Sequence, residues 1–473
     1  MMRARVCLAA LAAFATSACI SLDPELPKAD PQAASAFPVP GNAQEGNPPI
    51  NGVAFGTIDA DVGSDVRWQD FYTDPALRQL IATALANNRD LRVAVLNVER
   101  ARGLYQIQRA DRVPTITADA SAQRAAGYQQ DIEVYGVTAG LSAFELDLFG
   151  RVRSLTTSAL QQYFAQAEAR AGAQLSLVAE VANAYLTLAA DQELLTIARN
   201  TLASQEETYG IFERQHQAGY ISGLDLAQAR TEIEVARADV ANFADAVERD
   251  RNALTLLVGT PIDPALLPED FSAQVTAVAP LPIGMPSEVL LRRPDVRAAE
   301  FQLKATNANI GAARAAFFPR ITLTGNAGTV SGDLSDLFSG GTRAWSFIPQ
   351  ISVPIFEGGR LTANLDVAKT DRDIALAQYE RSIQASFKEV ADALGRTAWL
   401  AKQRSAREDL LVAATRADEL ALARYKAGLD NYVTRLISHR TFYLAQQSLV
   451  IVRLAEQSNR VTLYRVLGGG WNP

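Results

Sequence analysis

The chain has few cysteines and few histidines, which narrows the chemistry it can perform. Its 473 residues include two cysteines, Cys7 and Cys19, and two histidines, His216 and His439. Two cysteines cannot build a disulfide framework. A metal site needs three or four ligands, and no carboxylate cluster at ligand spacing accompanies either histidine. We therefore expect no metal, and no cofactor.

The sequence also lacks an excess of positive charge, long apolar runs and a catalytic motif. The net charge of −7 gives no indication of a nucleic-acid partner. Beyond the N-terminal leader no window of 18 apolar residues occurs. No nucleophile elbow is present, and the glycine-rich "LGGGW" (467–471) follows a helical pattern instead of opening one. We expect no enzyme. Aromatic residues, at 7%, are scarce enough to favour long helices over a large compact core.

The N-terminus "MMRARVCLAALAAFATSAC" is typical of a secretory signal, with two arginines, a short apolar run and small residues. The last residues of this stretch, up to Cys19, resemble a bacterial lipobox, although Thr16 stands where leucine is usual. The resemblance implies a signal peptide over 1–18 and a lipid on Cys19, with Ile20 favouring the outer membrane. Residues 19–66 then form the lipid anchor and a linker, whose Pro, Gly and Asn content suits a tether. The alternative is an ordinary signal peptide cut elsewhere.

The rest of the chain is one unit written twice. Residues 88–117 match residues 293–322 without gaps at an offset of 205, so that Pro114 falls on Pro319. Further along, the offset becomes 209, which places Gly219 on Gly428. The repeat predicts the same order of elements in residues 67–259 and 286–473, joined by a Pro-rich linker over 260–285.

Each half begins with a helical pattern, over about 75–112 and 286–318, that ends before a proline. Two extended segments follow in each half. The best period-2 signal lies in 344–356, where Trp345, Phe347 and Ile351 share one face and polar residues the other. An apolar face opposite a polar one suits a membrane barrel with lipid outside and water inside, or an amphipathic hairpin on a soluble core. Four strands cannot close a barrel, so closure would need several chains.

Long helical patterns follow the strands, beginning with about 66 proline-free residues from Val152, on the order of 100 Å of helix. After Gly223 apolar residues recur every seven residues, which predicts a left-handed coiled coil. Three polar residues interrupt the seams: Asp250, Glu456 and Asn459. They could face a lumen, fix the register or lie in a partly solvated seam. Gly219 and Gly428 fit helix ends where the chain reverses, because such turns commonly need positive φ.

Several stretches resemble the outer-membrane efflux protein family, the TolC-like channels, and more closely its lipoprotein branch. They include "RRPDVRAAEFQLKATNANIGAARAAFFPRITLTG" (292–325), "SVPIFEGGRLTANL" (352–365) and "LYRVLGGGW" (463–471), and they span nearly the whole mature chain. The resemblance implies a mainly α fold with a membrane β-barrel. Long antiparallel coiled-coil hairpins and four strands per chain would form a trimeric α/β-barrel channel-tunnel.

The resemblance also implies a function. A homotrimer in the outer membrane, in contact with its lipid and extending into the periplasm, would be the passive exit duct of a tripartite efflux system for drugs or other small molecules. Its partners would be a periplasmic adaptor (membrane fusion) protein and a proton-driven inner-membrane pump. The alternative is a TolC-like channel for protein secretion with an ABC-type pump. A periplasmic coiled-coil scaffold without a pore would leave the four amphipathic strands unexplained.

By position, the resemblance puts the periplasmic tip turns at Gly219 and Gly428 and the narrowest aperture just beyond the second. The family commonly has a leucine there and an aspartate four residues later; this chain has Val433 and Ile437. The sequence therefore predicts an aperture closed mainly by apolar contacts. The candidate polar neighbours of the aperture are Asp225, Asp430 and Arg435. Tyr425 is the candidate closing tyrosine, although packing between helices would also explain it.

Overall fold

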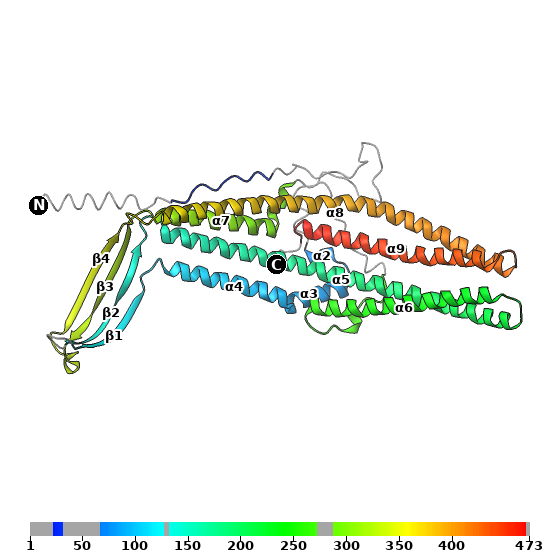
Figure 1. Cartoon of the computed structure of the whole chain (residues 1–473), viewed down its shortest axis with the longest axis horizontal. Helices are drawn as coiled ribbons and strands as arrows, with labels where there is room; N and C mark the ends of the chain where they lie inside the picture. Colours follow the sequence, from blue (N-terminus) through cyan, green and yellow to red (C-terminus); the bar gives the residue numbers. More distant parts are fainter. Residues whose placement is uncertain (1–21, 32–66, 127–131, 272–286, 470–473) are drawn as a thin grey trace. The chain divides into compact units, whose positions relative to one another are not determined.

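The computed structural model describes residues 22–31, 67–126, 132–271 and 287–469 (Figure 1). Within them the helices are α2 (Trp68–Phe71), α3 (Pro75–Asn87), α4 (Arg89–Ala110), α5 (Arg151–Gln217), α6 (Gly223–Val258), α7 (Pro294–Ala315), α8 (Arg360–Lys426) and α9 (Tyr432–Val466). The strands are β1 (Ile116–Ala125), β2 (Ile132–Leu146), β3 (Arg320–Ser331) and β4 (Arg343–Ser352). The short 3₁₀ turns are η2 (Pro264–Leu266), η3 (Ser287–Arg292) and η4 (Leu334–Asp336).

The chain divides into two compact units. Of the described residues, the first holds 22–31, 95–126, 132–169 and 295–382, and the second 67–94, 170–271, 287–294 and 383–469. In the first, the strands form one antiparallel sheet in the order β1-β2-β3-β4. The pairing of β2 with β3 joins the two halves of the repeat, with Ala139 opposite Ala327. No helix in the described residues is long and apolar enough to cross a bilayer.

The single helix expected over 75–112 is wrong, because the chain breaks at Asn88 between α3 and α4. The Asn88 carboxamide oxygen accepts the Leu91 N–H at 2.9 Å, and its nitrogen donates to the Leu257 carbonyl at 2.8 Å. This cap satisfies a free amide at the start of α4 and ties the break to the end of α6.

The helix expected over 286–318 is broken at the equivalent place, where Arg293 separates η3 from α7. Arg293 Nη1 donates to the Val466 carbonyl at 2.8 Å, and Pro294 takes the first position of α7. Arg293 and Val466 are the repeat counterparts of Asn88 and Leu257. Two different side chains thus make the same connection in the two halves.

The main hydrophobic core of the second unit includes the part of α5 that lies at the start of that unit. Phe71 and Tyr464 stack with ring centroids 4.1 Å apart, and Tyr72 packs edge-on against both. Buried residues of α3, α5 and α6 complete this cluster. Val450, Val461 and Tyr464 also belong to it, so the cluster joins the first hairpin to α9.

The predicted seven-residue seams are present, and in the second hairpin their polar members are buried and paired. Asn459 Nδ2 donates to the Ala393 carbonyl and to Thr397 Oγ1, both at 2.9 Å. Glu456, 9% exposed, pairs with Arg404 and Arg460, each at 2.9 Å. The bonds of Asn459 and one of those of Glu456 link α9 to α8, and of the three interpretations we favour register fixing for this pair of helices.

Asp250, the polar member of the first hairpin's seam, is half-buried beside Asp191 of α5. Burial first, and then the hydrogen bond and charge of Asp191, raise the pKa of Asp250 to about 6. A carboxyl whose folded pKa exceeds its unfolded value binds extra protons in the native state, so stability falls as pH rises from about 4 to about 6.

We expect Asp250→Asn to flatten this pH dependence and to stabilise the hairpin at pH 7. The thermal midpoint of helical circular dichroism, followed from pH 4 to pH 7.5, measures it. Asp245→Asn is the matched control, since Asp245 is an exposed partner of Arg249. An unchanged slope in Asp250→Asn would contradict the assignment.

The hairpin ends as the candidate functional site

Two turns of the same design end the helical hairpins of the second unit. At the first, Gly219 N–H donates to the His216 carbonyl and Tyr220 N–H to the Gln215 carbonyl. At the second, the Gly428 and Leu429 amides donate in the same way to Tyr425 and Arg424. This is the Schellman pattern. The two glycines have φ of 79° and 70°, and nothing lies within 4 Å of an added Cβ, so the backbone conformation alone calls for glycine.

The helices that leave the two turns are capped differently. Ser222 Oγ accepts the Asp225 N–H at 3.2 Å, and Asp225 Oδ2 accepts the Ser222 N–H at 3.3 Å in return, which forms a capping box. At the second turn Asn431 Oδ1 accepts the Thr434 N–H at 3.0 Å, without a box. Asp225, a candidate polar neighbour of the aperture, is thus engaged in its own helix start.

The other charged candidates are paired within the second hairpin. Arg424 forms two bonds with Asp430, at 2.6 and 3.0 Å, and holds the pKa of that carboxyl below its ordinary value. Arg435 Nη1 binds Asp418 Oδ1 at 2.7 Å, and His439 Nδ1 lies 3.4 Å from the same oxygen. Because Asp418 belongs to α8, this pair ties α8 to α9.

An aromatic cluster joins the two hairpins just behind the turns. Phe212 of α5 meets Tyr432 of α9 edge-on, with ring centroids 4.6 Å apart, and Tyr425 lies 6.2 and 6.0 Å from the two. Ala229 and Leu436 complete its buried part. Burial raises the pKa of Tyr432 to about 12, so its hydroxyl stays protonated. Tyr425 thus packs against rings of α5 and α9, and its role in closing the aperture stays a prediction.

Two polar contacts between α6 and α9 were not predicted from the sequence. Arg440 Nε binds Glu232 Oε2 at 3.1 Å while Nη2 binds the other oxygen, and Glu232 is 7% exposed. One turn further, Tyr443 donates to Asp239 Oδ2 at 2.9 Å. The partners are 208 and 204 residues apart, and the repeat gave no signal for them because an offset identifies equivalent residues and not contacting ones.

The two candidate aperture residues lie on the uncovered side of α9. Val433 and Ile437 are 41% and 59% exposed, and their spacing of four places them on one helix face. The structure does not bring them into contact with the charged candidates, whose side chains are paired elsewhere. Cys19, the expected lipid attachment point, lies outside the described residues.

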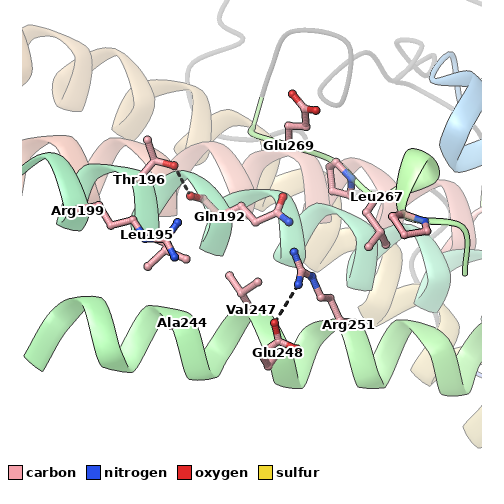
Figure 2. A pocket seen from close by; sticks show the side chains of 12 residues that line it. Gln192, Leu195, Thr196, Arg199, Ala244, Val247, Glu248, Arg251, Leu267 and Glu269 are labelled. Carbon is pink, nitrogen blue, oxygen red and sulfur yellow. Dashed lines mark hydrogen bonds and ion pairs between the residues drawn. The ribbon is translucent and has the colours of Figure 1, made fainter.

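A pocket of about 490 Å³ lies along the first hairpin, well before its turn (Figure 2). It is lined by residues of α5, α6 and the segment around η2. Among the side chains that line the pocket, Arg251 pairs with Glu248 at 2.9 Å. The Thr196 hydroxyl donates to the Gln192 carbonyl. No group of three potential metal ligands occurs in the described residues.

Comparison with sequence families matches residues 80–260 and 285–469 to the family described as Outer membrane efflux protein. The match covers both repeats, including both hairpins. The chain belongs to the outer membrane efflux protein family. The mainly helical fold with its four-stranded antiparallel sheet agrees with this membership and confirms the fold class expected from the sequence.

Relatives in this family support the assignment over most of the chain. The Toluene efflux pump outer membrane protein TtgC of Pseudomonas putida is 46% identical over 424 residues, covering 88% of this chain and 87% of the relative. Outer membrane protein OprJ of Pseudomonas aeruginosa is 42% identical, covering 89% and 88%. The open state of the Neisseria gonorrhoeae MtrE outer membrane channel superposes with a TM-score of 0.84 at 38% identity, covering 96% and 99%.

Proposed function

We propose that this chain is the outer-membrane exit channel of an efflux pump, formed by three copies and passive in itself. A partner pump in the inner membrane supplies the energy, and an adaptor protein joins the two. Relatives named as components of toluene, solvent and antibiotic efflux pumps support small molecules as the cargo. They do not favour the alternative of protein secretion.

The observation that carries the proposal is the open sheet. In the described residues β1 and β4 each pair on one side only, so the sheet ends in two long unpaired edges. Such edges are templates for pairing with another chain. On β4, Trp345, Phe347 and Ile351 are 80%, 58% and 66% exposed, an apolar face that suits lipid. If three such sheets join edge to edge, both unpaired edges of each sheet gain a partner.

The hairpin ends are the proposed gate and adaptor contact. The apolar face of Val433 and Ile437 would close the conduit when three copies meet. The aromatic cluster and the pairing of Glu232 with Arg440 would hold the two hairpins of one chain together in that state. Opening then requires the hairpins to separate, at the cost of these contacts.

The proposal is tested by purifying the chain in detergent and reconstituting it in planar bilayers. We expect trimers that resist SDS until heated and that conduct ions in discrete steps. Monomers that give no current would overturn the channel and support a scaffold. Export of a tripartite pump's toluene-like cargo, restored in cells that lack their own exit channel, would establish the transport role.

A further inference from the structure

The two halves of the repeat hold a pocket at the same place. The first is the pocket along α5 and α6 (Figure 2). The second, about 420 Å³, is lined by residues of α8 and α9. Because α5 and α8 each have 67 residues, the offset of 209 runs through both helices without a gap. At this offset all the residues of α8 and α9 that line the second pocket fall on residues that line the first.

The linings of the two pockets differ in charge. Three positions that are apolar in the first pocket are charged in the second, where Arg404, Arg453 and Glu456 replace Leu195, Ala244 and Val247. The linker between the repeats follows this difference. In the first half its apolar residues Pro264, Leu267 and Pro268 complete the lining. Of the described linker residues, Phe271 alone lines the second pocket, which leaves its charged side chains uncovered by the linker's apolar turn.

The two carboxylates of the second pocket are already paired inside it. Glu456 binds Arg404 and Arg460, each at 2.9 Å, and Arg404 also binds Glu408 at 2.9 Å. A guanidinium has five N–H donors. These ion pairs use two donors of Arg404 and one of Arg460. Both arginines therefore keep N–H groups for a further acceptor.

Arg453 adds a positive charge that is not paired. It is partly buried, and among the described residues it forms no hydrogen bond and no ion pair. Burial raises the pKa of the nearby Glu193 of α5, and the charge of Arg453 offsets this only in part. Charged groups removed from water are normally paired. The pocket thus holds three arginines against two carboxylates, with one cation left over.

Gln457 adds a second unsatisfied group to the same pocket. This side chain is 6% exposed, and its carboxamide oxygen is buried without a hydrogen-bond partner in the described part of the chain. A buried acceptor without a donor costs free energy. A ligand that fits this pocket therefore has acceptor oxygens for the arginines and an O–H for Gln457.

We propose that the second pocket binds a small oxyanion of the phosphate class. Arg453 supplies the unpaired charge, and Arg404 and Arg460 supply the donors that their carboxylates leave free. Inorganic phosphate keeps an O–H at neutral pH, which Gln457 accepts. The bound anion joins α8 to α9 in the second hairpin alone, since the first pocket has an apolar lining at the equivalent positions. This site goes beyond the proposed channel, which requires no bound ligand.

The test is calorimetric titration of the detergent-solubilised protein with inorganic phosphate, in a chloride buffer of constant ionic strength. We expect one phosphate to bind per chain. Arg453→Ala gives α9 the residue that α6 has at this position and leaves the ion pairs of the pocket in place. It should weaken binding at least about tenfold, as the loss of a charge-assisted hydrogen bond predicts. Arg416→Ala is the matched control, because this arginine of α8 is 68% exposed and pairs with Glu419 on the surface.

No binding by the parent chain, or equal affinity in the parent chain and Arg453→Ala, would overturn the site. Sulfate has the shape of phosphate but no O–H at neutral pH, so we expect it to bind more weakly. Equal affinity for the two anions would overturn the role of Gln457. Helical circular dichroism verifies that each variant is folded. None of these readouts depends on ion conductance, so a failed channel is a separate result.

Discussion

Replacing Glu232 with glutamine should raise the mean current through the reconstituted trimer about tenfold. The substitution keeps the size of the side chain but removes the charge that Arg440 pairs with across the two hairpins. Hydrogen bonds to charged groups contribute roughly 1.5–3 kcal/mol. Arg440 is 53% exposed, so we use a discounted value of about 1.4 kcal/mol. A free-energy change of this size shifts the equilibrium between the closed and open channel tenfold toward the open state.

The matched control is Glu206→Gln. Glu206 pairs with Arg237 at 3.1 Å, but this pair joins α5 to α6 inside the first hairpin and both side chains are about half exposed. We expect its current to equal that of the parent chain. Equal currents in all three proteins would show that the pairing of Glu232 with Arg440 does not hold the closed state.

The sequence predicted the features that rest on local patterns. The offsets of 205 and 209 identified two equivalent halves. The offset of 209 also paired Gly219 with Gly428, the two turn glycines that have positive φ. Period-2 alternation indicated a strand over 344–356, and β4 spans Arg343–Ser352. The second strand of the first half is expected over "VTAGLSAFELDLF" (137–149), whereas β2 begins five residues earlier, at Ile132.

Contacts between distant segments could not be predicted in the same way. The break at Asn88 depends on a carbonyl 169 residues away, and a helical pattern does not reveal it. The capping box between Ser222 and Asp225 was not predicted from the sequence, and the role of Asp225 beside the aperture stays a prediction. Residues 22–31 look like a linker by composition, because the bonds that hold them use mainly their own backbone groups, which bind side chains on α7 and α8.

Cysteine placed at Ile437 should make the channel sensitive to thiol reagents. Ile437 is 59% exposed on the same face of α9 as Val433 and does not take part in the charged pairs. If three copies meet there, three added charged groups would stand in the narrowest passage. The parent chain is the control, since its mature form is expected to carry only Cys19, occupied by lipid.

The central claim is that the hairpin ends of three copies close one conduit, and single-channel recording of Ile437→Cys tests it most directly. A positively charged methanethiosulfonate reagent is added from the side of the helical hairpins. We expect the current to fall in steps by more than half in Ile437→Cys and to stay unchanged in the parent chain. Full labelling of the cysteine, verified by mass, with no change in current would contradict it.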